Sequence, residues 1–328
     1  MQERLLSASY ASLPGECEDS FAMQADSQNA FLCVADGCGG LGSRRYPALD
    51  NHTGAYIAAR LATRSFLNWA QERRPMPDTP EMGAALCREL ESDLSGIFRH
   101  FADKHCRELP QNRIVGSMQR TLPCTFCAAV TQESTAVLRD ICFFWAGDSR
   151  GYLLDAQGLH QCTEDHLRSQ PDAFESLYRD TPLTSLLCAC QPIHISLRRL
   201  RAPLPCAVLT LTDGVFGCLS SPMELEMLLL NTLRAASSWE SWQRKLCNQF
   251  KKLCHDDATL LCQPCGATDF SAFKALMAAR RTVLQKQYVT PVRRHGHELA
   301  FAREKWRAYR QNYDWTQGGR HERADWRI

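Results

Sequence analysis

Short apolar runs that stand next to acidic residues are the clearest pattern along this 328-residue chain. Apolar runs at 20–24 and 30–35 flank a polar turn, which predicts a β-hairpin that leads into Asp36. Acidic residues also stand beside strand-like runs at Glu18-Asp19, Asp213-Gly214 and Asp256-Asp257. Carboxylates gathered from distant strands repel one another unless cations hold them together, and Mg²⁺ and Mn²⁺ prefer oxygen ligands. The pattern therefore predicts a carboxylate site for several metal ions.

Apolar residues at helical spacing separate the groups of predicted strands. They predict helices at 53–73, 79–105, 221–235 and 238–253, the third of which begins with the capping box Ser221-Pro222-Met223-Glu224. Because the strands come in clusters between helix pairs, the predicted fold class is α+β. We expect two packed antiparallel sheets flanked by helix pairs, an αββα sandwich, rather than a doubly wound parallel sheet. The other strands are predicted at 124–131, 135–146, 151–155, 194–200, 207–212 and 258–262.

The composition of the chain changes near residues 264–267. We predict one domain at 1–264 and a basic helical extension at 265–328, with helices at 270–288 and 297–313 separated by Thr290-Pro291. The last 63 residues contain 13 Lys and Arg against 6 Asp and Glu, whereas the whole chain has a net charge of only +2. We expect these basic helices to cover an acidic surface of their own domain or to bind an acidic partner, and not nucleic acid.

The bulk composition is typical of a soluble globular protein, with 45% hydrophobic and 23% charged residues. No apolar run approaches the roughly 20 residues needed to cross a bilayer. The N-terminal stretch also lacks the basic and apolar regions of a signal peptide. We therefore expect a cytoplasmic protein that does not bind a membrane.

The chain contains 17 cysteines, most of them inside apolar runs. An odd count without a secretion signal favours reduced, buried thiols over disulfides. Two CxxC pairs, Cys124 with Cys127 and Cys262 with Cys265, offer a zinc-bound scaffold as an alternative. The first pair lies in a predicted strand, where positions i and i+3 point to opposite faces, and this disfavours zinc.

Six acidic strings follow one another along the chain: Glu18-Asp19-Ser20, Val34-Ala35-Asp36-Gly37-Cys38-Gly39-Gly40, Ala146-Gly147-Asp148-Ser149-Arg150, Thr163-Glu164-Asp165-His166, Leu211-Thr212-Asp213-Gly214 and Asp256-Asp257-Ala258-Thr259. In this order they resemble the metal-dependent protein phosphatases of type 2C, bacterial-type members included, over about residues 8–264. A single Asp-Gly is a common turn dipeptide and carries no such information. The ordered set is specific.

The resemblance implies a hydrolase that removes phosphate from Ser and Thr of phosphoproteins, paired in signalling with a cognate Ser/Thr kinase. Hydroxide bridging two Mn²⁺ or Mg²⁺ ions would attack the phosphomonoester in line, and a third ion would bind more weakly. By the same resemblance, Asp36 bridges both ions, the Gly37 carbonyl binds one and Asp148 binds the weaker ion. The remaining metal-site and catalytic residues implied are Asp19, Asp213 and Asp256, with Glu18 acting through bound water.

Several positions leave alternatives open. Asp257 is the alternative to Asp256 as a ligand, and Asp148 has a second reading as a turn cap. Most family members place a phosphate-binding Arg five residues before the first metal-ligand Asp, where this chain has Pro14. We hypothesise that Arg44 or Arg45 binds the substrate phosphate instead, the alternative being a solvated pair of arginines.

The missing Arg also supports a second function, a catalytically weak regulatory or phosphoprotein-binding module of the same fold. A second departure lies between His166 and Pro182, where the chain is shorter than the mobile flap that members usually carry. We expect His166 itself to be structural, and we expect substrate selection to differ from that of other members.

Overall fold

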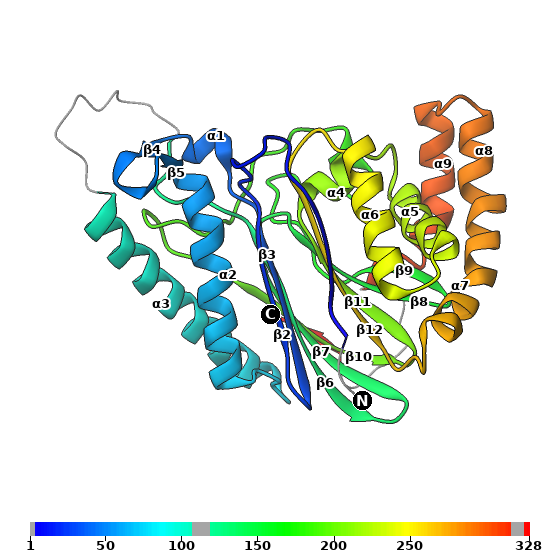
Figure 1. The fold of residues 1–328 in the computed structure, drawn as a ribbon, viewed down its shortest axis with the longest axis horizontal. Helices are drawn as coiled ribbons and strands as arrows, with labels where there is room; N and C mark the ends of the chain where they lie inside the picture. The colour runs from blue at the N-terminus through cyan, green and yellow to red at the C-terminus, as the bar shows by residue number, and fades with distance from the viewer. Residues whose placement is uncertain (1–3, 107–118, 316–324) are drawn as a thin grey trace.

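The computed structural model describes residues 4–106, 119–315 and 325–328. Two antiparallel sheets pack face to face, and helices cover the outer face of each sheet (Figure 1). The predicted α+β sandwich is therefore confirmed. In the described part of the chain, no helix is both long and apolar enough to cross a membrane.

The first sheet joins strands from both ends of the sequence. Its edge strand β1 pairs with β12, with Leu6 opposite Cys262, so that residues 6–10 complete a sheet whose other strands come much later. All neighbours in this sheet are antiparallel. In spatial order the strands are β1 (Leu6–Tyr10), β12 (Ala258–Cys265), β11 (Cys206–Leu211), β8 (Arg150–Asp155) and β9 (Gly158–Gln161).

The second sheet contains the predicted hairpin. Every residue of β3 is buried, because one face of the strand meets the other sheet and the opposite face meets helices. A separate two-stranded ribbon consists of β4 (Arg45–Tyr46) and β5 (His52–Thr53). In spatial order the six strands are β13 (Trp326–Arg327), β10 (Ser196–Pro203), β7 (Leu138–Ala146), β6 (Phe126–Thr135), β3 (Asn29–Ala35) and β2 (Ser20–Ala25).

Side-chain caps start most of the long helices. The hydroxyl of Thr53 accepts a hydrogen bond from Tyr56 N at 3.1 Å, and Thr79 and Ser238 cap their helices in the same way. The predicted capping box of the third long helix is wrong, because Ser221 makes no side-chain cap and Ser220 donates to Glu224 instead. The helices are α1 (Gly39–Gly42), α2 (Gly54–Arg73), α3 (Pro80–His105), α4 (Asp213–Gly217), α5 (Pro222–Ala235) and α6 (Trp239–Leu253), with 3-10 turns at Pro47–Leu49 and Glu175–Leu177.

The C-terminal helices pack beside α5 on the first sheet's side of the sandwich (Figure 1). They are α7 (Phe270–Leu284), a π-helical turn (Gln285–Val289), α8 (Thr290–Arg294) and α9 (Leu299–Arg310). The predicted break at Thr290-Pro291 is wrong, because proline is tolerated in the first turn of a helix and α8 runs through it. The break lies at 295–298 instead.

The four CxxC thiols are buried in different parts of the core. Cys124 precedes β6, so the strand predicted from this residue begins two positions later. Its side chain lies in the cluster under α2 and α3, whereas Cys127 and Cys265 lie between the two sheets. Cys262 faces the helices of the first sheet. The arrangement therefore does not bring these thiols together as a four-ligand zinc site.

Candidate active site

The predicted acidic residues meet where strands of the two sheets end. In the hairpin, Ser20 pairs with Ala35, and this register sets Asp19 beside Asp36. In the first sheet, the end of β11 lies next to the start of β12, so that Asp213 and the pair at 256–257 are neighbours. Asp148 occupies the turn between β7 and β8, and β8 pairs with β11. The fold thus gathers acids that are far apart in sequence.

Burial and mutual repulsion dominate the electrostatics of this cluster. Burial raises the pKa of Asp36 well above its usual range, and the charges of Asp213, Asp19 and Asp148 raise it further. Burial likewise raises the pKa of Asp148 to about 8, with a further contribution from Asp213. Such shifts mean that negative charge at this site is costly without a compensating cation.

Two observations indicate that these residues fit a cation. The buried Oδ1 atom of Asp19 has no hydrogen-bond partner, although Thr212 donates to Oδ2 at 2.8 Å. The carboxyls of Asp36 and Asp213 lie within hydrogen-bonding contact of each other. Carboxylate oxygens are the donors that Mg²⁺ and Mn²⁺ prefer.

The acids are neighbours rather than a formed coordination shell. Within residues 4–106, 119–315 and 325–328, no three His, Cys, Asp or Glu side chains converge in a metal-binding arrangement. Asp19 and Asp36 flank the hairpin, and Asp213 begins the short helix α4.

Backbone packing explains the glycine after Asp36. Gly37 N donates to the Glu18 carbonyl at 3.3 Å, which fixes the loop before β2 against the loop after β3. A Cβ atom at Gly37 would lie 2.5 Å from the Ala55 carbonyl oxygen, so no other residue fits without a shift of the backbone. The Glu18 side chain accepts a hydrogen bond from the Thr53 hydroxyl at the start of α2.

The adjacent acids Asp256 and Asp257 have different environments. Asp257 is buried, and its carboxylate accepts hydrogen bonds from Ser12 N at 2.8 Å, from the Ser12 hydroxyl at 2.9 Å and from Glu18 N at 2.6 Å. Asp256 is exposed, and one of its oxygens accepts only from Asp257 N. Asp257 therefore fastens the loop that carries Asp19. No pattern in the sequence signals this role.

The arginines proposed to bind phosphate lie on the surface of the loop after α1. Arg45 is exposed, pairs with Glu16 at 2.6 Å and donates to the Asn51 carbonyl at 3.0 Å. The guanidinium of Arg44, also exposed, lies 5.4 Å from the centre of the Tyr46 ring.

Another arginine, Arg60 of α2, was missed by sequence reasoning. Its Nη2 donates to the Cys17 carbonyl at 3.0 Å, and its guanidinium stacks 3.2 Å above the Tyr56 ring. Arg60 therefore supports the loop that leads into Asp19 from the side of α2. The apolar periodicity of the helix gave no signal for it.

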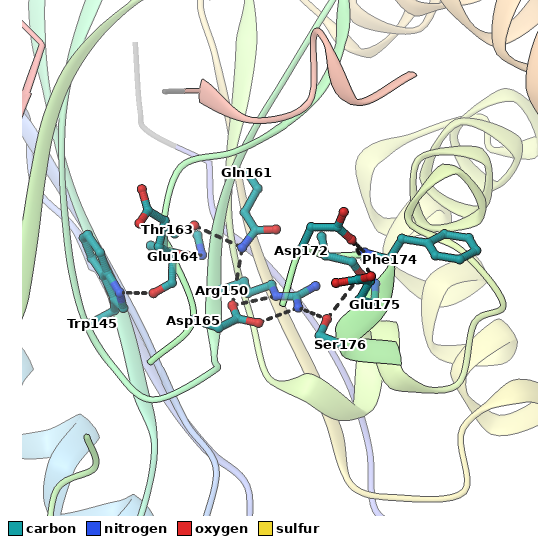
Figure 2. Close-up of polar contacts among 12 residues, drawn as sticks. Trp145, Arg150, Gln161, Thr163, Glu164, Asp165, Asp172, Phe174, Glu175 and Ser176 are labelled. Atoms are coloured by element: carbon teal, nitrogen blue, oxygen red, sulfur yellow. Dashed lines mark hydrogen bonds and ion pairs between the residues drawn. The ribbon is translucent and has the colours of Figure 1, made fainter. Parts of the chain in front are cut away.

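The turn that carries Asp148 rests on a buried ion pair. Arg150 donates to both oxygens of Asp165, at 2.9 and 2.6 Å, and its Nη2 also donates to the Ser176 hydroxyl at 2.7 Å (Figure 2). Next to Asp165, His166 accepts from Gly147 N at 3.2 Å, which leaves the ring proton on Nε2. These contacts hold the Asp148 turn from both sides.

Comparison with known proteins matches the chain to the family described as protein phosphatase 2C over residues 13–258. The chain belongs to the protein phosphatase 2C family. The members of this family are protein phosphatases, so the predicted enzyme class is that of the family. A comparison with curated protein sequences gave no match.

Solved structures show the same fold at low identity. The serine/threonine phosphatase Stp1 from Staphylococcus aureus is 14% identical, with a TM-score of 0.56 over 80% of this chain and 95% of that one. The Mycobacterium tuberculosis phosphatase PstP/Ppp is 18% identical, with a TM-score of 0.53 over 80% and 99%. A PstP catalytic domain in complex with two manganese ions is 16% identical, with a TM-score of 0.50 over 80% and 98%.

The unequal environments of the two acids at 256–257 give a testable difference within this candidate site. We expect Asp257→Asn to lower the free energy of unfolding by about 1–3 kcal/mol, because one amide oxygen cannot accept from all three half-buried donors. Asp256→Asn should leave stability nearly unchanged and weaken Mn²⁺ binding. Urea unfolding in EDTA and Mn²⁺ titration calorimetry measure the two effects. If Asp257→Asn instead weakened Mn²⁺ binding and Asp256→Asn lowered stability, Asp257 would be the ligand.

Proposed function

We propose that this protein hydrolyses phosphoserine and phosphothreonine esters of proteins in a reaction that requires Mn²⁺ or Mg²⁺. The cluster of buried and half-buried carboxyls at the sheet ends is the observation that carries this proposal, because its charges need cations. When bound, two such ions supply a nucleophilic water at neutral pH and neutralise charge on the phosphoryl group. The complex of PstP with two manganese ions supports this number of ions.

The chain's own residues would hold and orient the ions in distinct ways. We propose Asp36 as the bridging ligand, since the charges of Asp213, Asp19 and Asp148 all act on its carboxyl. Thr212 fixes one oxygen of Asp19 and leaves the other for an ion. The further ligands proposed are the Gly37 carbonyl, Asp213, Asp256, Glu18 through water, and Asp148 for a weaker third ion.

We also propose that the basic extension covers acidic residues of its own chain. Arg280 pairs with Glu226, Arg293 with Glu224, and Arg310 with Asp172. These contacts favour an internal role over an acidic partner protein. We further propose that the chain divides into a domain at 1–264 and an extension at 265–328. We also propose a cytoplasmic location and a cognate Ser/Thr kinase as a partner in signalling.

Turnover distinguishes the enzyme from a regulatory module of the same fold. We would measure phosphate release from a phosphothreonine peptide with added Mn²⁺ and with EDTA. Release that requires Mn²⁺ supports the enzyme. Peptide binding without release in either condition would refute the proposed activity and favour the regulatory module.

The exposed arginines after α1 allow a test of how phosphate is bound. If Arg44 or Arg45 holds the substrate phosphate, the double replacement by Ala should raise KM for the phosphopeptide about tenfold, the effect of losing a charge-assisted hydrogen bond. Steady-state kinetics with Mn²⁺ provide the measurement. Arg99→Ala, at an exposed position on α3, is the control. An unchanged KM in the double variant would show that neither arginine binds the substrate phosphate and that both are solvated surface residues.

A further inference from the structure

We propose that α9 and the turn after it brace the segment at 168–184 against Arg150, and thereby position one wall of the active site for a protein substrate. We call residues 168–184 the rim segment. This inference rests on the proposed phosphatase function for its effect on substrate. The bracing itself rests on contacts that run continuously from the C-terminal helices to the Asp148 turn.

The first step links α9 to the rim segment. Arg310 Nη1 donates to Asp172 Oδ2 at 2.9 Å. The other oxygen of Asp172 accepts from Phe174 N at 3.0 Å and from Glu175 N at 2.9 Å, so this carboxylate shapes the turn that Arg310 holds. Phe174 also stacks on Trp306 of α9, with ring centres 6.2 Å apart, and both rings are fully buried.

The second step links the rim segment to the candidate active site. Ser176, two residues after Phe174, accepts from Arg150 Nη2 at 2.7 Å (Figure 2). The guanidinium of Arg150 lies 3.9 Å from the centre of the Phe216 ring in α4, the helix that begins with Asp213. Arg150 is itself two residues from Asp148. One buried cation therefore contacts the rim segment and the elements that carry two of the proposed ligands.

The third step is the anchoring of α9 itself. The Tyr313 hydroxyl lies 3.1 Å from that of Tyr152 in β8, and the Tyr313 carbonyl accepts from Gln161 N at 2.8 Å. Arg310 is held by a second ion pair, at 2.6 Å, with Asp314. Contacts outside the rim segment therefore fix the orientation of the Arg310 guanidinium toward Asp172. A guanidinium held in this way acts as a brace, which a mobile surface charge would not.

The part of the rim segment that remains exposed is suited to contact a polypeptide. Tyr178 is 49% exposed, and Arg179 and Asp180 beside it are also exposed. The Tyr178 hydroxyl donates to the Ser220 carbonyl at 2.7 Å, which places this end of the segment next to the residues that follow α4. A protein substrate would meet these side chains, whereas a small aryl phosphate would reach only the carboxylate site.

Replacement of Arg310 by Ala tests the brace with two readouts. We expect tryptic cleavage after Arg168 or Arg179 to become at least about fivefold faster, because local opening of the rim segment becomes easier. We also expect KM for a phosphothreonine peptide to rise by about the same factor, with kcat/KM for p-nitrophenyl phosphate within about twofold of wild type. Arg310→Lys, which keeps the charge, should recover part of both effects.

Arg281→Ala is the matched control, because Arg281 belongs to the same extension but donates to Asn231 of α5. It should change neither readout. The brace is refuted if Arg310→Ala matches wild type in proteolysis, or if it lowers turnover of both substrates equally. Cleavage needs no catalytic activity, so an inactive wild-type protein would refute the proposed function while the proteolysis result still decides on the brace.

Discussion

Asp36→Asn is expected to abolish Mn²⁺-dependent phosphopeptide hydrolysis and, in the absence of metal, to make the protein more stable. Burial, followed by the charges of Asp213, Asp19 and Asp148, opposes the ionisation of Asp36. Loss of one preorganised electrostatic group at a reacting centre typically costs at least about a hundredfold in rate. The same change removes a carboxyl that must be either charged or protonated at a cost in the folded, metal-free protein, because burial and the charges of Asp213, Asp19 and Asp148 oppose its ionisation.

Thermal unfolding and kinetics together test this pair of effects. In EDTA, the variant should unfold about 1–2 °C above wild type, since roughly 1 kcal/mol corresponds to about 1.5 °C at an unfolding entropy of about 2.1 cal/mol/K per residue. Added Mn²⁺ should stabilise wild type more than the variant, because ligand binding to the folded state alone raises its stability. Asp93→Asn, on the surface of α3, is the control. A variant that keeps full activity would exclude Asp36 as a ligand.

Glu226→Ala is expected to give the largest loss of stability, about 3–5 kcal/mol. The Glu226 carboxylate on α5 is fully buried. It accepts from Arg280 Nε at 2.6 Å, from Arg280 Nη2 at 2.8 Å and from the Tyr309 hydroxyl at 2.6 Å. Its removal would leave a largely buried guanidinium and a buried hydroxyl without their acceptor, in the layer that joins α7 and α9 to α5.

Urea unfolding measures this loss, and a double variant separates its causes. Glu226→Leu combined with Arg280→Met should recover most of the stability, because apolar side chains of similar size need no partner. The exposed pair of Arg4 and Glu240 is the control, and Glu240→Ala should leave the unfolding midpoint nearly unchanged. A small effect of Glu226→Ala would show that the C-terminal helices do not depend on this contact.

Local patterns in the sequence were enough to predict much of the sandwich. The hairpin that ends at Asp36 and the helix capped by Thr53 follow from periodicity and capping, which depend on residues close in sequence. Local rules also explain the errors. Serine is a common helix cap, but the side chain that bonds to Glu224 is that of Ser220 and not that of Ser221. At Pro291 the rule for ending a helix competes with the tolerance of proline in a first turn.

The roles of individual site residues depend on contacts that no local pattern reports. Asp256 and Asp257 are adjacent and chemically identical, and only the distant Ser12 and the Glu18 backbone distinguish them. The link from Arg310 to Asp172 joins positions 138 residues apart. β13 is only two residues long, too short for any periodicity, and exists because β10 offers it an edge.

The order of strands also has a consequence for how the protein is synthesised. Residues 6–10 are synthesised long before their partner strand β12, which lies at 258–265. In the other sheet, one edge of β10 also stays unpaired until its partner β13, at 326–327, is synthesised. While the residues between these partners are synthesised, the nascent chain must therefore keep its unpaired strand edges away from other chains. Removal of β1 or β13 would replace a short edge strand by the longer edge of β12 or β10 and favour self-association over a smaller, intact fold.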